Sequence, residues 1–206
     1  MDIKINMENY QSPYKNYIIS CHEILKPEQM KNEYDIYLKQ KISSRLVGKC
    51  YRDYGYVCEI YKILEESNCE IEDENLSGSA KIKLKISCKI CLPIKNKEII
   101  CKIVSLNKEI IKGVNGPILF IIENNNINTN NFYIDINRNI RSSTTSQILS
   151  QGIYVRVLID KIKINDNEKN IIAYGPLLSL ATPDEIKLFN FDLQINDTET
   201  EAEQFN

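Results

Sequence analysis

The chain has 206 residues, of which 43% are hydrophobic and 26% are charged; its formal net charge is −2 and its pI is about 5.6. This length accommodates one large domain or two small ones. The slightly acidic balance excludes a generally basic nucleic-acid-binding protein, so any such binding must come from local patches. The sequence has no apolar run long enough to cross a membrane, no signal-peptide pattern and seven cysteines, so we expect a soluble intracellular protein with reduced thiols.

The pattern of strand and helix signals in residues 14–92 predicts a small α+β domain. A polar segment at residues 1–13, which we expect to be flexible, precedes it. The domain begins with a strand within Tyr14–Leu25. Pro27 then suits the first turn of a helix, and Gly48 suits a left-handed cap just past its end. The helix would present one apolar face, formed by Met30, Tyr34, Tyr37, Leu38, Ile42 and Leu46.

The longest predicted strand ends this domain, after a β-rich segment from Cys50 to Leu64 and an acidic, turn-like segment from Glu70 to Gly78. Its apolar and cationic residues alternate until Pro93 ends it. Because side chains alternate faces along a strand, one face is expected in the core and the other toward solvent or an acidic partner. The apolar positions are Ala80, Ile82, Leu84, Ile86, Cys88, Ile90 and Leu92, and the cationic positions are Lys81, Lys83, Lys85 and Lys89.

Residue types needed for catalysis or metal binding are scarce. Cys88 and Cys91 lie three apart in a strand and so face opposite sides, and no second close cysteine pair exists, so we predict no metal site and no cofactor. His22 is the only histidine, which excludes a histidine-based triad or metal cluster. The chain also lacks a glycine-rich phosphate loop, so we predict no catalytic residue. One alternative stays open: a metal-dependent nuclease, whose carboxylates would be distant in the sequence and brought together by the fold.

Residues 93–183 predict a second domain made of short strands without a helix. Five antiparallel strands in this length fit a small closed barrel, and the OB-fold is the commonest such barrel that binds nucleic acid. The strands are expected at Glu98–Leu106, Glu109–Val114, Pro117–Ile122, Ile153–Ile164 and Lys169–Tyr174, with a polar loop from Arg138 to Gln147. Residues 184–206 form an acidic tail, which is typical of a segment that is solvated or ordered by a partner.

Several short motifs occur in a fixed order along both domains. They are residues 45–57 (RLVGKCYRDYGYV), 78–85 (GSAKIKLK), 97–100 (KEII), 152–159 (GIYVRVLI) and 172–175 (IAYG). With this ordered set the chain resembles, over residues 15–183, the seventh-subunit (stalk) family of eukaryotic RNA polymerase II and its counterpart in archaeal RNA polymerase. Its composition is similar to versions encoded by large DNA viruses.

This resemblance implies both a fold and a role. The fold would be α+β: an N-terminal truncated RNP-like tip domain followed by a five-stranded OB-fold barrel of the ribosomal S-one type. The role would be that of a non-catalytic stalk subunit of a DNA-directed RNA polymerase, which docks to the core enzyme and contacts nascent RNA during transcription.

Two loops of the tip domain dock to the polymerase core in the family that the chain resembles. The matching residues are Lys26, Pro27, Glu28 and Gln29 before the helix, and Asn75, Leu76, Ser77 and Gly78 before the long strand. Leu76 is an apolar residue among polar turn residues, which suits an anchor in a partner's pocket. The alternative is that Leu76 packs on the core of its own domain.

The barrel is the predicted RNA-binding surface, because OB-folds bind strands of nucleic acid across their second and third strands and the flanking loops. The candidate phosphate contacts are Lys108, Lys112, Arg138, Arg141, Arg156, Lys161 and Lys163. Aromatic residues for base stacking are few: Phe120, Phe132, Tyr133 and Tyr154. We therefore predict weak, salt-sensitive, sequence-tolerant binding; the alternative is that the cations are solvated and Phe120 and Tyr154 belong to the core.

Three tyrosines in the tip domain, Tyr51, Tyr54 and Tyr56, suggest either packing or a base-stacking platform. Packing is favoured, because the basic motif that accompanies such a platform is absent.

The predicted partners are the polymerase core subunits, namely the largest subunit and its neighbours, and nascent single-stranded RNA, with no membrane. A fourth-subunit-like stalk partner stays open. The expected location is intracellular: a viral factory in the host cytoplasm or the virion for a viral chain, and the nucleus for a cellular one. The alternative function is a free-standing OB-fold RNA-binding or translation factor, which would rest on the barrel alone.

Overall fold

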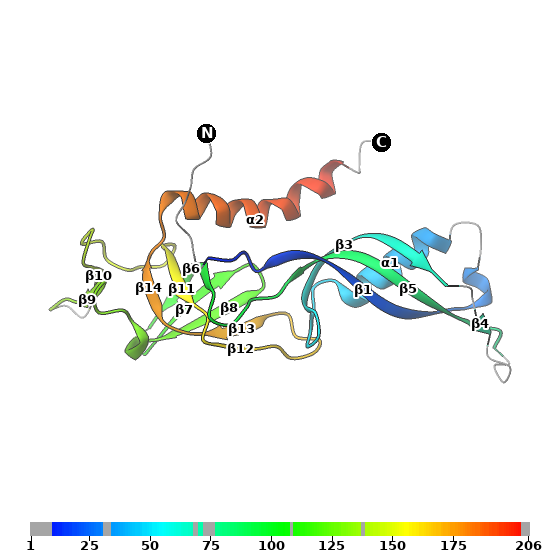
Figure 1. Ribbon diagram of the computed structural model, residues 1–206, viewed down its shortest axis with the longest axis horizontal. Coiled ribbons are helices and arrows are strands. Elements are labelled where there is room, and N and C mark those ends of the chain that lie inside the picture. Colours follow the sequence, from blue (N-terminus) through cyan, green and yellow to red (C-terminus); the bar gives the residue numbers. More distant parts are fainter. Residues whose placement is uncertain are drawn as a thin grey trace. The chain divides into compact units, whose positions relative to one another are not determined.

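The structure is a computed structural model that describes residues 10–30, 34–67, 70–71, 77–107, 109–136 and 139–202. It is mostly β-sheet with two α-helices (Figure 1). Contacts divide the chain into two compact units. Residues 14–92 and 166–169 form one, called the N-terminal unit below, and the remaining residues form the other, called the C-terminal unit.

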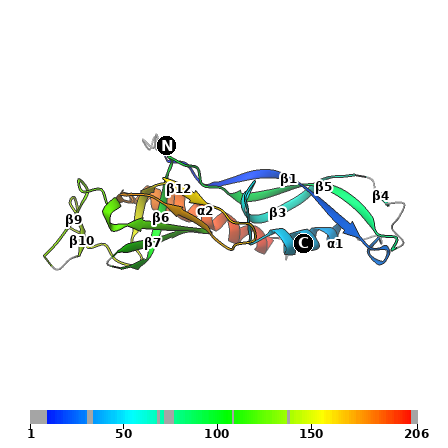
Figure 2. The ribbon, with the colours of Figure 1, turned by 90° about the horizontal axis from the view of Figure 1, so that it is seen from below.

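The N-terminal unit is an antiparallel sheet with the strand order β1-β5-β3-β2, and β4 pairs with β5. One helix, α1, lies along one face of this sheet (Figure 2). The elements in chain order are β1 (Tyr14–Leu25), the 3-10 turn η1 (Pro27–Gln29), α1 (Tyr34–Leu46), β2 (Cys50–Tyr51), β3 (Gly55–Glu66), β4 (Glu70–Ile71) and β5 (Ala80–Cys91).

The long strand β5 confirms the predicted alternation over most of its length. Its apolar residues are buried from Ala80 to Ile90, whereas Lys81, Lys83 and Lys85 are exposed. The prediction is wrong for Lys89, which is buried and lies with its Nζ 5.2 Å from the centre of the Tyr14 ring. The cationic face therefore ends at Lys85, because β5 is covered on both sides over its last four residues.

Helix α1 packs on the sheet through four of the predicted residues: Leu38, Ile42 and Leu46, which are buried, and Tyr34, which is partly buried. The predicted start of the helix is too early, since Pro27–Gln29 is a separate 3-10 turn and α1 begins at Tyr34. Met30 and Tyr37 are exposed rather than part of the buried face. The predicted cap is confirmed: Gly48 has a φ of 80°, in the left-handed region that favours glycine.

The C-terminal unit is built on a seven-stranded sheet with the order β12-β13-β8-β7-β6-β11-β14, and β9 pairs with β10 in a separate two-stranded sheet. The elements are β6 (Glu98–Leu106), β7 (Ile110–Asn115), β8 (Ile118–Glu123), the 3-10 turn η2 (Asn124–Asn126), β9 (Phe132–Ile134), β10 (Ile140–Ser142), β11 (Tyr154–Leu158), β12 (Lys161–Lys163), β13 (Ile171–Tyr174), β14 (Leu177–Leu180) and α2 (Pro183–Ala202).

Two details of the predicted strand pattern are corrected by this sheet. The neighbours β8 and β13 run parallel, so the strands are not all antiparallel. The strand expected over Ile153–Ile164 is divided into β11 and β12, and the polar loop expected from Arg138 contains β10.

A sharp bend separates β11 from β12, and a matching bend at Gly175 separates β13 from β14. A side chain at Gly175 would overlap the carbonyl oxygen of Leu158, so the close approach of the two segments requires glycine. Backbone hydrogen bonds continue across the bend, from Leu158 N–H to Pro176 (3.2 Å) and from Asp160 N–H to Tyr174 (2.9 Å). The two ends of the strand order, β12 and β14, thus belong to one bent hairpin.

The acidic tail begins as a helix that is fixed at its first turn. In α2, the Glu185 carboxylate accepts the Thr182 N–H (2.8 Å), and the Thr182 hydroxyl accepts the Glu185 N–H (3.4 Å). This reciprocal pair is a capping box, and Pro183 occupies the first helical position. Within the described residues, no helix combines the length and apolarity that a membrane crossing needs.

Candidate docking loops and cationic surface

The two loops predicted to dock lie next to each other at one end of the N-terminal unit. Gly78 has a φ of 65°, and a Cβ placed on it would lie 3.3 Å from the Cγ of Pro27. The first loop thus meets the second where the chain enters β5. Asn75 and Leu76 lie outside the described residues, so the geometry concerns Lys26–Gln29 together with Ser77 and Gly78.

Local hydrogen bonds shape both loops. The Lys26 N–H donates to the Gln29 side chain (3.0 Å), and the Gln29 side-chain amide donates to the Tyr37 hydroxyl of α1. In the second loop, the hydroxyls of Ser77 and Ser79 are 2.8 Å apart. The side chains of Lys26, Pro27 and Glu28 are exposed, so this turn presents a cation, a rigid ring and an anion on a fixed backbone.

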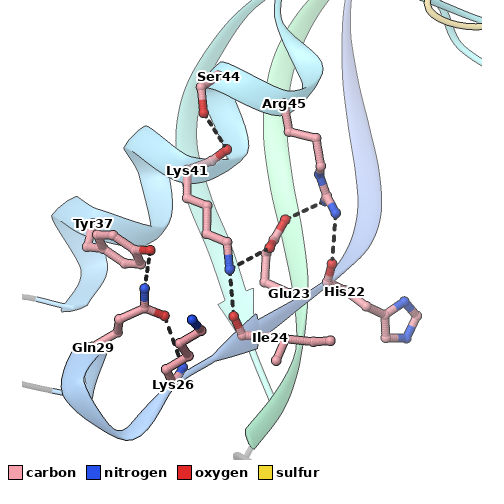
Figure 3. A network of polar contacts seen from close by, with 9 residues as sticks. All are labelled: His22, Glu23, Ile24, Lys26, Gln29, Tyr37, Lys41, Ser44 and Arg45. Atoms are coloured by element: carbon pink, nitrogen blue, oxygen red, sulfur yellow. Dashed lines mark hydrogen bonds and ion pairs between the residues drawn. The ribbon is translucent and has the colours of Figure 1, made fainter. Parts of the chain in front are cut away.

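A buried carboxylate three residues before the first loop fixes α1 to β1, and sequence reasoning missed it. Glu23 is 4% exposed and lies 2.6 Å from the Arg45 guanidinium and 3.3 Å from the Lys41 ammonium (Figure 3). Lys41 also donates to the carbonyl oxygen of Ile24, and Arg45 to that of His22 (3.3 Å). A buried carboxylate is tolerated when such partners replace its water.

A signal for this network was present in the sequence. Glu23 occupies an inward-facing position of β1, as Ile19 and Leu25 do, but it is charged where they are apolar. Lys41 and Arg45 lie four apart and therefore on one side of α1, as a partner for an inward carboxylate requires. The network holds the helix against the strand from which the first docking loop emerges.

Three of the predicted RNA contacts are lysines on the outer face of the main sheet. Residues that pair directly across strands share a face. The register joins Lys161 of β12, through one residue each on β13 and β8, to Lys112 of β7. These two lysines are three strand spacings apart, roughly 14 Å along the sheet. Lys163 is exposed on the same face of β12.

A fourth cation on this surface, Lys102 of β6, was missed by sequence reasoning. It is exposed, and its pairing with Val114 places it diagonally next to Lys112 on the neighbouring strand. On its other side Lys102 pairs with Tyr154 of β11, whose ring centre is 5.6 Å from the lysine Nζ. The alternation of Lys102 with the buried Cys101 and Ile103 was the available signal.

Two of the predicted arginines, Arg141 and Arg156, are engaged within the protein. Arg141 lies in the β9–β10 hairpin, 2.8 Å from Asp135, and donates to the carbonyl oxygen of Ser146 (3.1 Å). Arg156 of β11 forms an ion pair with Glu185 of α2 and lies 3.6 Å from Glu98 of β6. Lys108 and Arg138 lie outside the described residues.

The aromatic candidates separate into core and surface. Phe120 is fully buried, which supports the alternative that it is a core residue, and Phe132 is 2% exposed as well. Tyr154 packs edge-on against Phe189 of α2, with ring centres 5.2 Å apart. Tyr133 is 45% exposed on β9.

Packing accounts for two of the three tyrosines that suggested a stacking platform in the N-terminal unit. Tyr51 and Tyr54 pack against its core, with ring centres 6.4 Å apart, and the Tyr51 hydroxyl donates to the carbonyl oxygen of Arg45 (3.0 Å).

Of the cysteines that the structure describes, Cys50, Cys88, Cys91 and Cys101 are buried, and Cys21 and Cys58 are partly buried. Cys88 is fully buried, as the sequence suggested, and burial raises its pKa to about 11. Burial raises the pKa of Cys58 to about 12, and raises that of Cys101 as well. These groups are therefore neutral near pH 7. Across the described ranges, no three His, Cys, Asp or Glu side chains are grouped as a metal ion would need.

Taken together, the chain is a β-rich protein with two adjoining loops on one unit and a lysine-bearing sheet on the other. No protein-family model matches it. It is 36% identical over 168 residues to the "Putative DNA-directed RNA polymerase subunit L376" of Acanthamoeba polyphaga mimivirus, an alignment that covers 82% of this chain and 83% of the relative. The chain belongs to the family of this mimivirus RNA polymerase subunit.

Proposed function

We propose that the chain is a non-catalytic stalk subunit of a multisubunit DNA-directed RNA polymerase. In this role it docks to the core enzyme through its N-terminal unit and contacts nascent single-stranded RNA through its C-terminal unit. The observation that carries the proposal is membership, over most of both chains, in the family of a viral protein named as a subunit of such a polymerase. The same relationship favours a viral polymerase that works in a viral factory in the host cytoplasm or in the virion.

The strand order of the C-terminal unit supports the assignment of an OB-fold barrel. In order along the chain, β6, β7, β8, the β11–β12 arm and the β13–β14 arm correspond to five strands. The first three pair consecutively, the fourth pairs with the first, and the fifth runs parallel to the third. The fourth and fifth arms pair through the bend at Gly175, which is how a five-stranded sheet would close on itself.

The adjoining loops support the docking part of the proposal. Lys26–Gln29 and Ser77–Gly78 converge on one surface, although the first and last of these residues lie 52 positions apart in the sequence (78 − 26). The Glu23 network keeps this surface rigid, which lowers the entropy lost on binding. Polymerase core subunits are the proposed partners of this surface.

The lysines of the sheet support the RNA part. Lys102, Lys112, Lys161 and Lys163 contact phosphates in this proposal, because they lie on the outer surface and can follow a flexible backbone without reading bases. Few rings are exposed beside them, so affinity would be low and strongly dependent on salt.

Copurification tests the docking proposal. The tagged chain is purified from its native source at a salt concentration that screens surface charge, and the largest polymerase subunits are sought by mass spectrometry. We expect them in stoichiometric amounts with the wild type and in reduced amounts after the swap Lys26→Glu with Glu28→Lys. The swap Asp35→Lys with Lys39→Asp on α1 is the matched control, since both swaps preserve net charge.

Loss of polymerase from the wild-type sample would contradict the proposal. In that case, tight RNA binding by the chain alone, persisting at two salt concentrations in a filter assay, would favour a free-standing OB-fold RNA-binding or translation factor.

A further inference from the structure

The outer face of three neighbouring strands carries a continuous strip of cationic and aromatic side chains. The strip runs from Lys112 on β7 through Lys102 on β6 to Tyr154 and Arg156 on β11. Each step is a direct or diagonal neighbour across the sheet, so the four side chains lie within reach of one short strand of nucleic acid. Lys102 is exposed and Lys112 is half-buried at one end of the strip, whereas Tyr154 and Arg156 at the other end are half-buried beneath a helix.

The cover is the first half of α2. Glu185 is fully buried and forms an ion pair with Arg156. One helical turn further, Phe189 is 4% exposed and packs edge-on against Tyr154 at 5.2 Å. Near the next turn, Asp192 accepts hydrogen bonds from the hydroxyls of Ser12 (2.7 Å) and Tyr10 (3.4 Å), which hold the helix along the sheet.

The groups that α2 places on the strip are those that RNA would supply. A carboxylate on Arg156 occupies the position of a phosphate, and an aromatic ring on Tyr154 occupies that of a base. The spacing of Glu185 and Phe189, four residues apart on one side of α2, matches the neighbouring positions of Arg156 and Tyr154 on β11. The helix and a nucleic acid strand cannot use these two side chains at the same time.

We propose that α2 is a built-in competitor for the RNA-binding strip, and that single-stranded RNA displaces its first half to reach Tyr154 and Arg156. This inference rests on the proposed RNA contact of the C-terminal unit. RNA is favoured over an acidic peptide because the strip pairs cations with an aromatic face and continues into the exposed Lys102 and the half-buried Lys112. Each of these features matches the repeating phosphate and base of a nucleic acid.

The test compares two variants of the full chain, each of which replaces one carboxylate of α2 by the corresponding amide. Glu185→Gln removes the charge that occupies Arg156, whereas Asp184→Asn removes the same charge next to it, from a side chain whose ion pair is with Lys187 at 3.0 Å. Binding of a fluorescent oligouridine of about 12 nucleotides is followed by anisotropy at low salt. We expect Glu185→Gln to bind about fivefold tighter than wild type and Asp184→Asn to remain within about a factor of 1.5.

Two further variants keep the result interpretable if Glu185→Gln folds poorly. Phe189→Ala uncovers Tyr154 without changing charge, and is expected to increase affinity by a similar factor. Adding Arg156→Gln to Glu185→Gln should remove the gain, because the released guanidinium is its source. Amide hydrogen exchange in α2 should also accelerate when RNA is added to the wild type.

Several outcomes would overturn the inference. If wild type binds RNA but neither Glu185→Gln nor Phe189→Ala binds more tightly than Asp184→Asn, α2 is only structural and the proposed RNA contact survives alone. If α2 becomes protected when RNA binds, it is part of the RNA site and not a competitor. If an oligoglutamate peptide displaces α2 as well as oligouridine does, the assignment of RNA is wrong. If no form binds RNA, both the inference and the proposed RNA contact fail.

Discussion

Each unit of the protein attaches a helix to a sheet through a buried glutamate, but the two glutamates have opposite charge environments. In the N-terminal unit, Glu23 is 4% exposed and faces two cations, Arg45 and Lys41. In the C-terminal unit, Glu185 is fully buried and shares one cation, Arg156, with Glu98. The first cluster thus has an excess of positive charge and the second an excess of negative charge.

This difference shows how the same interaction can serve a fixed contact in one place and an exchangeable contact in another. Around Glu23, both cations remain partly exposed, so the carboxylate is the group that depends on its partners. Around Arg156, one guanidinium is shared by two carboxylates, so any further anion that binds it must replace one of them. A rigid frame is what a docking loop needs, whereas a removable helix suits a surface with an alternative occupant.

The two units also differ in the number of thiols whose pKa values are raised by burial. The N-terminal unit contains Cys50, Cys58 and Cys88, whose pKa values burial raises to about 11, 12 and 11. In the C-terminal unit burial raises the pKa of Cys101. The thiolate is the disfavoured form in every case.

The largest expected effect is an alkaline loss of stability that falls mainly on the N-terminal unit. The folded pKa of each thiol lies above its ordinary value of 9.0, so the unfolded chain releases the proton first. Their stabilising contribution is complete below about pH 9 and is lost as the pH rises toward the folded values. At pH 10 we expect the free energy of unfolding to fall by about 1 kcal/mol for each thiol. The loss is then about 3 kcal/mol from these three and about 1 kcal/mol from Cys101.

Urea unfolding at pH 8, 9 and 10 in reducing buffer measures this slope. The variant Cys50→Ala with Cys58→Ala and Cys88→Ala should flatten the dependence on pH about three times as much as Cys101→Ala. An unchanged slope in the triple variant would show that other groups cause the loss.

Removing the first carboxylate should have the next largest effect. Glu23→Ala leaves Arg45 and Lys41 without their buried partner and detaches α1 from β1, so we expect a loss of about 2 kcal/mol in the free energy of unfolding. The matched control is Glu65→Ala on the same sheet, whose exposed pair with Lys85 should contribute no more than about 0.5 kcal/mol. Equal urea midpoints for the two variants would remove the distinction between the buried and the surface pair.

The second carboxylate should matter less. Glu185→Ala removes the capping box of α2 and the nearer of the two carboxylates beside Arg156, and leaves Glu98 at 3.6 Å from that guanidinium. We expect a loss of about 1.5 kcal/mol, confined to the helix and its contacts. Amide exchange should therefore accelerate in α2 and not in β6–β8, and Asp184→Ala should change neither. Acceleration throughout the C-terminal unit would mean that α2 is an integral part of its core.

The smallest effect concerns the surface lysines of the two sheets. Replacing Lys112 and Lys161 together by alanine should weaken oligouridine binding by about fourfold, about twofold per lysine, and reduce its dependence on salt. The comparison is the double change of Lys81 and Lys83 on β5, which removes the same charge from the other unit. A similar loss from both pairs would place RNA on the N-terminal unit as well.

Local patterns predicted most of the strands, because alternation reports directly which face is buried. The long strand before Pro93 and the strands β6, β7 and β8 follow this rule within one or two residues. The bend in the predicted strand 153–164 was not visible, because it depends on the contact between Leu158 and Gly175. The parallel pairing of β8 with β13 is likewise a long-range choice that no local pattern contains.

For the acidic tail, average composition was a poor guide, because a few particular residues fix the start of this segment as a helix on the sheet. The start of the acidic tail overlaps the sequence Thr-Pro-Asp-Glu at residues 182–185, a recognisable capping box, and the apolar Phe189 follows. For the candidate surfaces, the lysines on strands could be identified from their alternation. Arg156 could not be assessed, because its partner Glu185 lies 29 residues away and only the fold brings the two together.

The hydrogen bonds at Asp192 have a consequence for how the chain can be handled. They join the segment before β1 to the helix after β14 across 180 residues of sequence. Shortening or extending either segment will therefore change the stability of the other. The effects of Ser12→Ala and Asp192→Ala on the free energy of unfolding should not add. An affinity tag or fluorophore attached near one end is best regarded as a perturbation of both.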